Sequence, residues 1–241
     1  MPMPSETVAR VAEKFEAQER RPVEYARVAE NTTKRLIDIC VAVVGLTLSA
    51  PVLLFFLALV ALESPGSPIY IQKRIGRNGQ IFDIYKLRTM FSGADTDGFK
   101  TAKDDRRLTV TGKLLRATNI DELPQLVNVL NGDMSLIGPR PLSVDETEYI
   151  IKHFNIWSSY PGFFPSARPG LVGLEQVNRN KEMTYLERFS YNNEYETNWS
   201  LYLDGQIFIK ALIICRHVCY ALMAGGALLL SLMAAGITLA G

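Results

Sequence analysis

The chain has 241 residues, of which 48% are hydrophobic and 21% are charged, and its formal net charge is +1. This length allows one sizeable domain together with membrane segments. The balance of charge and hydrophobicity excludes a disordered chain and a nucleic-acid binder that uses its whole surface. The three cysteines form no CxxC pair and the two histidines lack metal-ligand spacing, so neither a disulfide framework nor a zinc site is predicted.

A polar leader occupies residues 1–33 and contains six glutamates and five Lys or Arg residues. A secretory signal would have its apolar region nearer the start, with a small-residue cleavage site after it, so no signal peptide is predicted. We expect a helical or partly ordered segment at the membrane surface and assign it no function.

The first long apolar block covers residues 36–62 and carries one charge, Asp38. A straight helix of this length would measure about 40 Å, which exceeds the roughly 30 Å hydrocarbon core of a bilayer. Pro51 lies mid-block and would kink or break the helix. The residues alone favour a kinked span over a re-entrant hairpin that enters and leaves by one face. Because Lys34 and Arg35 place the first end in the cytoplasm, a span would carry the next domain outside, whereas a hairpin would keep it inside.

A polar domain follows at residues 64–217, and its first part reads as a β-hairpin. Strand-like runs at 68–75 and 80–90 are joined by Gly-Arg-Asn-Gly at 76–79. Asn-Gly between two such runs is a strong signal for a hairpin turn. Residues 92–106 are rich in Gly, Asp and Lys and predict an exposed loop.

Helices are predicted in the rest of this domain. From Asn119 to Leu130 apolar residues recur at i, i+3, i+4 and i+7, which indicates one apolar face. Asn-Gly at 131–132 ends that helix in the usual way. A shorter helical stretch begins at 111–116, and residues 185–214 read as mostly helical.

The second apolar block, residues 218–241, carries no charge. It is long enough for one transmembrane helix. Lys210 and Arg216 precede it, so its first end should face the cytoplasm.

Adjacent carboxylates, Asp121 and Glu122, occur at the start of the predicted 119–130 helix, just before Pro124. Proline suits an early helical position, and the unpaired N–H groups and positive dipole end of a helix N-terminus stabilise ionised carboxylates. An ionised carboxylate can bind Mg²⁺ or attack phosphorus. Helix capping explains the same two residues, and the pattern alone favours capping.

Basic residues surround this carboxylate pair. Residues 73–116 contain eleven Lys or Arg residues against five Asp, a net charge of 11 − 5 = +6. Lys86 and Arg88 are two apart on a predicted strand and so point to one face, and Arg140 lies between two prolines, which suits bidentate phosphate binding. Carboxylates beside several cations are typical of phosphoryl transfer. A solvated face or contact with anionic lipid is favoured instead for Arg77, Arg106 and Arg107.

Five segments then occur in a definite order: KRLIDIC (34–40), PIYIQKRIGRNGQIFDIYKLRTM (68–90), IDELPQLVNVLNGDMSLIGPRP (120–141), RPGLVGLEQV (168–177) and NWSLYLDGQIF (198–208). Together they resemble the monotopic polyprenol-phosphate phosphoglycosyl transferases, the bacterial sugar transferase family. They cover most of residues 34–214. Each is moderately specific alone, and the five in order are very specific.

The resemblance implies an α+β fold that is mostly α, with a small β-hairpin and surface helices. It implies a re-entrant membrane helix-break-helix at 34–63, which reverses the preference drawn from the residues alone. The catalytic domain at 64–217 would then lie on the cytoplasmic face of a bacterial inner membrane. The block at 218–241 would then be an extra hydrophobic helix, either a transmembrane helix or a contact for a partner, because compact members end soon after the last segment.

The resemblance also implies a chemistry. Asp121 would attack the sugar-linked phosphate of a UDP-sugar, release UMP and hold a covalent phosphosugar, which polyprenol (undecaprenyl) phosphate would then attack. Glu122 would assist through Mg²⁺ or as a base for the acceptor, and both carboxylates would lie at the metal. Asp204 matches a late aspartate with a structural or supporting role, and segment 142–167 departs from the family pattern and is a candidate border of the sugar site. Positions expected to bind phosphates are Lys86, Arg88, Arg116, Arg140 and Arg168.

Other functions and partners stay open at this stage. A non-catalytic scaffold that binds anionic lipid would use the carboxylate pair only as a cap, and a phosphatase-like hydrolase would release free sugar phosphate. The expected partners are the UDP-sugar, polyprenol phosphate and membrane lipids, without nucleic acid. A homo-oligomer and glycosyltransferases of the same pathway are further candidates, and neither the sugar nor the prenyl chain length can be read from the residues.

Overall fold

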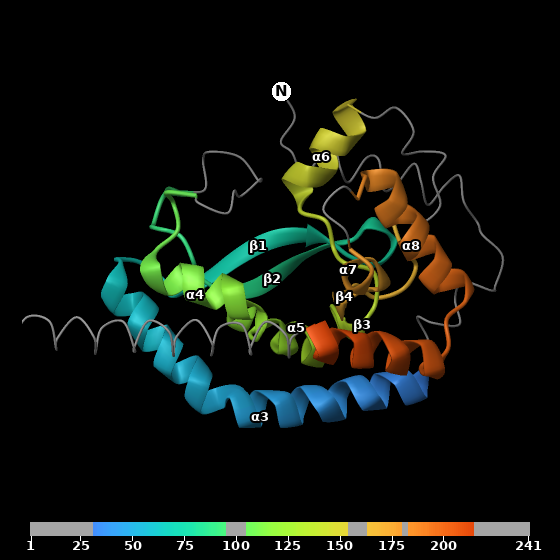
Figure 1. Cartoon of the computed structure of the whole chain (residues 1–241), viewed down its shortest axis with the longest axis horizontal. Coiled ribbons are helices and arrows are strands. Elements are labelled where there is room, and N and C mark those ends of the chain that lie inside the picture. The colour runs from blue at the N-terminus through green and yellow to red at the C-terminus, as the bar shows by residue number, and fades with distance from the viewer. Residues whose placement is uncertain (1–30, 95–104, 154–162, 180–182, 215–241) are drawn as a thin grey trace, which may run out of the picture.

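The computed structural model describes residues 31–94, 105–153, 163–179 and 183–214 (Figure 1). Most of the predicted leader, most of the predicted 92–106 loop and the second apolar block lie outside the described residues. The described chain is mostly helical and contains two small two-stranded sheets. This confirms a mainly α fold with a β-hairpin.

Helix α3 (Thr32–Glu63) contains the whole first apolar block. Asn31 caps it by accepting a hydrogen bond from the backbone N–H of Lys34 at 2.8 Å. The chain stays helical through Pro51, so its two limbs meet at a bend (Figure 1) rather than at an interruption of the helix. Near the bend the Thr47 hydroxyl donates to the Val43 carbonyl at 2.9 Å, a bond that often accompanies bending of a helix.

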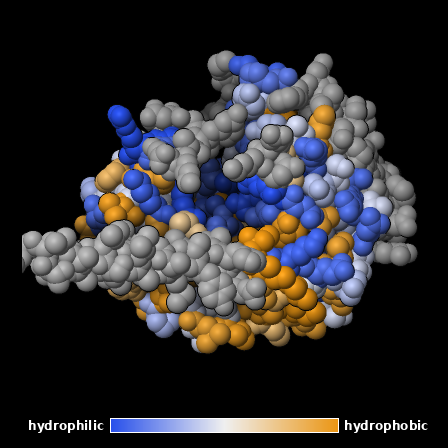
Figure 2. Space-filling view, in the orientation of Figure 1, coloured by the Kyte–Doolittle hydropathy of each residue, from blue (hydrophilic) through white to orange (hydrophobic). Residues whose placement is uncertain are grey.

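The outer surface of α3 is apolar and exposed. Leu48, Leu54 and Leu62 are 75%, 67% and 84% exposed, and Figure 2 shows hydrophobic residues gathered along the lower edge, where α3 lies. The helix is long and apolar enough to cross a membrane. Such a surface is costly in water, which indicates association with a membrane.

Polar contacts fix the first end of α3 to the domain. The Lys34 ammonium forms a buried ion pair with Asp204 at 2.7 Å. Asp38 accepts hydrogen bonds from the Ser135 hydroxyl at 2.7 Å and from the Leu136 backbone N–H at 3.1 Å. Because buried charges need such partners, these contacts explain charged residues at the start of an apolar helix.

The second end of α3 is fixed to the same domain. The Arg88 guanidinium donates to the carbonyls of Ser64 and Pro65 at 2.6 and 2.9 Å. Glu63 accepts from the backbone N–H groups of Val110 and Thr111 at the start of α4. Both ends of the apolar helix therefore lie against one polar domain.

The predicted hairpin is confirmed as β1 (Ile69–Ile75) and β2 (Ile81–Leu87), which pair antiparallel from Ile69↔Leu87 to Ile75↔Ile81. The turn contains the short helix η1 (Arg77–Gly79), where Asn78 and Gly79 have φ values of 52° and 80°. Asparagine and glycine tolerate this left-handed region best. The second strand ends earlier than predicted, at Leu87.

The single helix predicted from Asn119 to Leu130 is wrong. Helix α4 (Val110–Thr118) ends at Asn119, which adopts a left-handed conformation with φ 56°. A 3₁₀ turn, η3 (Ile120–Glu122), follows, and α5 (Gln125–Asn131) begins only after Pro124. Proline lacks an N–H and cannot make the helical hydrogen bond, while the leucine and valine spacing still buries one side of α5.

The remaining elements close the domain around the GPRP and RPG segments. Strands β3 (Ser135–Ile137) and β4 (Gly170–Val172) pair in parallel, and Gly138 and Gly170 approach so closely that neither has room for a side chain. The segment predicted as helical over 185–214 is interrupted at residues 198–200. The other helices are α6 (Val144–His153), α7 (Leu174–Val177), α8 (Tyr185–Thr197) and residues 201–214.

Candidate active site

A pocket of about 1130 Å³ opens between the β-hairpin, α4 and η3, and Figure 2 shows it as a hydrophilic hollow. Its lining is cationic, because six basic residues face three carboxylates there. Such a pocket concentrates anionic ligands. The charged residues that line it are Lys73, Arg74, Lys86, Arg88, Arg107, Arg116, Asp121, Glu122 and Asp145.

Glu122 is held between two cations. One of its carboxylate oxygens accepts from Lys86 at 2.9 Å and from Arg140 at 2.8 Å. Burial alone would raise the pKa of Glu122, but the charges of Arg140 and Lys86 outweigh it and hold this pKa well below its ordinary value. Glu122 therefore stays ionised and fixes the position of both cations.

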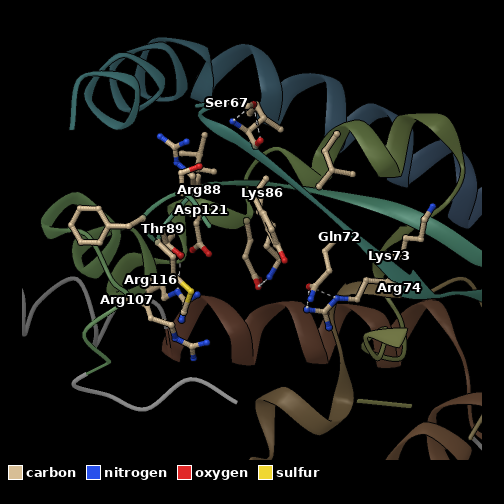
Figure 3. A pocket seen from close by; sticks show the side chains of 18 of the residues that line it. Ser67, Gln72, Lys73, Arg74, Lys86, Arg88, Thr89, Arg107, Arg116 and Asp121 are labelled. Atoms are coloured by element: carbon tan, nitrogen blue, oxygen red, sulfur yellow. Dashed lines mark hydrogen bonds and ion pairs between the residues drawn. The ribbon is translucent and has the colours of Figure 1, made fainter. Parts of the chain in front are cut away.

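Asp121 lies beside this trio in a different environment. Only 7% of the residue is exposed, and Figure 3 shows its carboxylate pointing into the pocket on the side of Thr89 and Arg116. Burial, helped by the negative charge of Glu122, raises the pKa of Asp121 despite the opposing charges of Lys86 and Arg116. No hydrogen bond from another described side chain reaches the Asp121 carboxylate. Its oxygen atoms are therefore available to a ligand in the pocket.

Arg116 forms the other wall of the pocket. It comes from the last turn of α4, and its Nε donates to the Thr89 hydroxyl at 2.9 Å. Burial lowers the pKa of Arg116, although Asp121 opposes this effect. A guanidinium oriented by one hydrogen bond retains N–H groups for a phosphate.

The structure thus brings together five of the predicted site residues, and it places the others elsewhere. Arg88 borders the pocket, but its guanidinium binds the end of α3, because β2 has already ended at Leu87. Arg168 does not line the pocket and donates from Nε to the Gly132 carbonyl at 3.1 Å. The Asp204 carboxylate pairs with Lys34 and accepts a hydrogen bond from the Tyr195 hydroxyl at 2.9 Å. These contacts join separate segments of the fold, which indicates a structural role.

Replacement of Arg88 by methionine is expected to destabilise the fold by about 2–4 kcal/mol, because buried carbonyls at the end of α3 would lose their charged donor. The thermal unfolding midpoint in detergent would measure this loss. Lys73→Met is the matched control, because Lys73 pairs with Asp83 at 62% and 47% side-chain exposure and such pairs contribute little. Equal midpoints for the two variants would contradict the structural assignment of Arg88.

Sequence analysis missed Arg74 and Gln72 on β1. The Arg74 guanidinium donates to Gln72 Oε1 at 3.0 and 2.6 Å and to the Pro141 carbonyl at 3.1 Å. Burial, followed by repulsion from Arg140, lowers the pKa of Arg74 to about 10. Alternate residues of a strand lie on one face, so residues 70, 72 and 74 share a face. This period of two could have identified Gln72 and Arg74 as pocket residues.

The side chains of the pocket suit one mode of binding a divalent cation. Among the described residues no group of three or more His, Cys, Asp or Glu side chains could hold a metal by itself. Mg²⁺ is commonly bound by one or two carboxylates together with substrate phosphates and waters. The pocket-facing carboxylate of Asp121 suits this mode, whereas Glu122 already pairs with two cations.

Comparison with known proteins identifies the family to which this chain belongs. A family model described as bacterial sugar transferase matches residues 29–217. The chain belongs to the bacterial sugar transferase family. This confirms the family predicted from the five segments and, with it, the prediction that the protein is an enzyme.

Several named bacterial proteins are similar to this chain. The exopolysaccharide production protein ExoY of Sinorhizobium fredii is 36% identical over 196 residues, covering 75% of this chain and 84% of that protein. The UDP-glucose:undecaprenyl-phosphate glucose-1-phosphate transferase of Caulobacter vibrioides is 40% identical over 190 residues, covering 76% and 70%. The undecaprenyl-phosphate galactose phosphotransferase of Salmonella typhimurium is 32% identical over 209 residues, covering 80% of this chain and 42% of that longer protein.

Proposed function

We propose that this sugar transferase moves a sugar 1-phosphate from a UDP-sugar to undecaprenyl phosphate, giving a polyprenyl diphosphate sugar and UMP. The observation that carries the proposal is a buried carboxylate, Asp121, that faces a cationic pocket beside the Lys86–Glu122–Arg140 ion cluster. The names of the Caulobacter and Salmonella relatives support the same acceptor, and the Caulobacter name supports a UDP-sugar donor.

The first step is an attack by Asp121. A carboxylate oxygen of Asp121 forms a bond to the phosphorus that carries the sugar, and the bond from that phosphorus to the bridging oxygen breaks. The electron pair leaves with UMP, and the phosphosugar remains as an acyl phosphate on Asp121. Lys86, Arg116 and Arg140 supply positive charge for the phosphate oxygens, which is the main protein contribution to phosphoryl transfer.

The second step restores the carboxylate. An oxygen of the acceptor phosphate attacks the same phosphorus, and the bond from phosphorus to the Asp121 oxygen breaks. A phosphate monoester is largely ionised at neutral pH, so this attack requires no base. The lowered pKa of Glu122 makes it a poor proton acceptor, and its proposed role is to position Lys86 and Arg140.

Magnesium is part of this proposal. When bound, Mg²⁺ would neutralise charge on the diphosphate of the donor. Asp121 is the residue placed to hold it, together with phosphate oxygens of the substrate. Glu122 would act on the ion mainly through its negative charge.

The proposed location is the cytoplasmic face of the inner membrane, with α3 as a re-entrant helix. Both ends of α3 bind the same domain through Asp38, Glu63 and Arg88, which supports entry and exit on one side. The acceptor is a lipid whose phosphate lies at the interface, so an active site held at that depth can reach it.

Cysteine labelling tests this topology. In a variant with serine at positions 40, 215 and 219, single cysteines replacing the exposed Thr33 and Ser67 at the two ends of α3 are expected to react with an impermeant maleimide in inverted vesicles and not in spheroplasts. A cysteine replacing Leu48 should stay unreacted in both, because lipid covers it. Reaction of the two ends from opposite sides would establish a span instead.

UMP release tests the activity. Detergent-solubilised protein is incubated with a panel of UDP-sugars and Mg²⁺, with and without undecaprenyl phosphate. Acceptor-dependent UMP from one donor supports the proposal and identifies the sugar, whereas free sugar phosphate formed without acceptor would indicate a hydrolase. Folded protein that releases no UMP from any donor would favour the lipid-binding scaffold.

A further inference from the structure

The pocket has a second end, away from the proposed nucleophile. Figure 3 places Gln72 and Arg74 on one side of Lys86 and places Asp121, Thr89 and Arg116 on the other side. The Asp121 side carries the groups suited to phosphate. The Gln72 side therefore faces a part of the ligand that is remote from the reacting phosphorus.

Asp145 belongs to this second end. Segment 141–145 runs alongside the end of β1: Arg74 forms an antiparallel bridge with Ser143 and donates to the Pro141 carbonyl, and the Ile75 backbone N–H donates to the Leu142 carbonyl at 2.8 Å. Asp145 follows two residues later, in the first turn of α6, and lines the pocket as an exposed residue. It comes from segment 142–167, which the resemblance to the family makes a candidate border of the sugar site.

The cations at this end, Lys73 and Arg74, already have partners in Asp83, Gln72 and the Pro141 carbonyl, whereas Asp145 is matched to a hydroxyl rather than to a phosphate. A carboxylate accepts hydrogen bonds and donates none, and it repels a phosphate at close range. The Asp145 carboxylate makes no ion pair or hydrogen bond with the residues that the structure describes. An uncharged ligand group that suits Asp145 is a hydrogen-bond donor, and in a sugar nucleotide the hydroxyls of the sugar and ribose rings are such groups.

Gln72 complements Asp145. Its Oε1 accepts two hydrogen bonds from Arg74, which fixes the orientation of the amide because only the oxygen can accept. The N–H groups of Gln72 Nε2 donate to no acceptor among the described residues and so remain available as donors. A hydroxyl both donates and accepts, so a carboxylate and an amide that line the same pocket suit it.

We propose that Asp145, together with Gln72, binds the hydroxyl groups of a ring of the donor and so contributes to recognition of the sugar nucleotide. This inference rests on the proposed function and adds residues that recognise its donor. It assigns recognition to the second end of the pocket and chemistry to the Asp121 end. The ring is that of the sugar or that of the ribose, and the experiment separates the two.

The experiment compares Asp145→Ala and Asp145→Asn with the wild type across UDP-hexoses that differ at single hydroxyl groups. We expect kcat/KM for the preferred donor to fall about tenfold to hundredfold in Asp145→Ala, because a hydrogen bond to a charged group is lost, and to fall less in Asp145→Asn. Glu148→Gln is the matched control on α6, because Glu148 does not line the pocket, and it should behave as wild type.

Inhibition by UMP distinguishes the rings, because UMP carries the ribose without the sugar. If Asp145 binds the sugar ring, Asp145→Ala should discriminate less between donors and should be inhibited by UMP as strongly as wild type. If Asp145 binds the ribose ring, UMP should inhibit Asp145→Ala less strongly, and discrimination between donors should stay unchanged. If kcat/KM for every donor stays within about twofold of wild type in Asp145→Ala, the inference is wrong and the proposed function stands. A folded wild-type protein that releases no UMP from any donor would overturn the proposed function, and the inference with it.

Discussion

Asp121→Asn is expected to reduce sugar-phosphate transfer by a factor of about 10³ or more, because an amide cannot serve as the attacking nucleophile. The fold should survive this change. Burial raises the pKa of Asp121, which means that the folded protein disfavours the ionised carboxylate. Replacement by a neutral group of the same size should therefore leave the thermal unfolding midpoint unchanged or raise it.

Mass spectrometry provides the decisive measurement for Asp121. Wild-type protein mixed with donor in the absence of acceptor should gain the mass of one phosphosugar on the peptide that contains Asp121. The asparagine variant should gain none, although it should still bind UMP. Full transfer by Asp121→Asn, or a phosphosugar located on another residue, would show that the nucleophile has been assigned wrongly.

The acid side of the pH profile should report the same residue. A carboxyl group whose pKa is raised in the folded protein is protonated more readily than in the unfolded chain, for which the ordinary value is 3.8. The protonated form cannot attack phosphorus, so activity should decline as the pH falls toward the raised pKa of Asp121. The unfolding free energy moves in the opposite sense, because the stabilisation conferred by the raised pKa is complete below 3.8 and is lost as the pH rises through the raised pKa of Asp121.

Local signals predicted the fold well where a few neighbouring residues decide the conformation. The Asn-Gly turn identified the hairpin, although its second strand ends at Leu87, before the predicted end at residue 90. The 119–130 helix failed because periodicity reports which residues face the core and does not report whether the helix is continuous. Asn119 in a left-handed conformation and the missing N–H of Pro124 divide that segment into a 3₁₀ turn and a shorter helix.

Contacts between distant segments explain what the sequence could not predict about the site. Spacing placed Lys86 and Arg88 on one face, but the strand ends between them, and Arg88 binds carbonyls of a helix more than twenty residues earlier. Arg74 joined the site only because the GPRP segment packs beside β1. Such pairings depend on tertiary structure, and neither propensity nor periodicity encodes them.

The placement of Asp121 and Glu122 shows the same limit on a finer scale. Sequence analysis treated them as one pair that a helix N-terminus would stabilise. The structure places them in a 3₁₀ turn, where burial raises the pKa of Asp121 while two cations lower that of Glu122. Neighbouring carboxylates with opposite shifts suit different tasks, one as a group exposed to the ligand and the other as a fixed counter-ion.

Glu122→Gln is therefore expected to behave unlike Asp121→Asn, and to lower the free energy of unfolding by about 2–3 kcal/mol, because it leaves Lys86 and Arg140 as partly buried cations without a counter-ion. Transfer should fall by a factor of about 10² or more, since both cations would lose their fixed positions. Thermal unfolding in detergent and UMP release are the two measurements.

The pH dependence of the stability lost in Glu122→Gln follows from the direction in which the pKa of Glu122 is shifted. The pKa of Glu122 is lowered from 4.5, so the stability that it contributes is complete above that value and disappears as the pH falls through the lowered pKa. The difference in stability between wild type and Glu122→Gln should be constant from about pH 6 to pH 8 and shrink in acid. A difference that instead grew in acid would contradict the assigned ion cluster.

A second substitution separates the counter-ion role from simple packing. Lys86→Met combined with Glu122→Gln removes one of the two stranded cations, so the double variant should regain part of the stability lost by Glu122→Gln, with a coupling free energy of about 1 kcal/mol or more. UMP should also raise the unfolding midpoint of Glu122→Gln more than that of wild type, because its phosphate can neutralise Lys86 and Arg140. Additive losses and an unchanged response to UMP would mean that Glu122 does not balance these two cations, and the division of roles between the adjacent carboxylates would have to be abandoned.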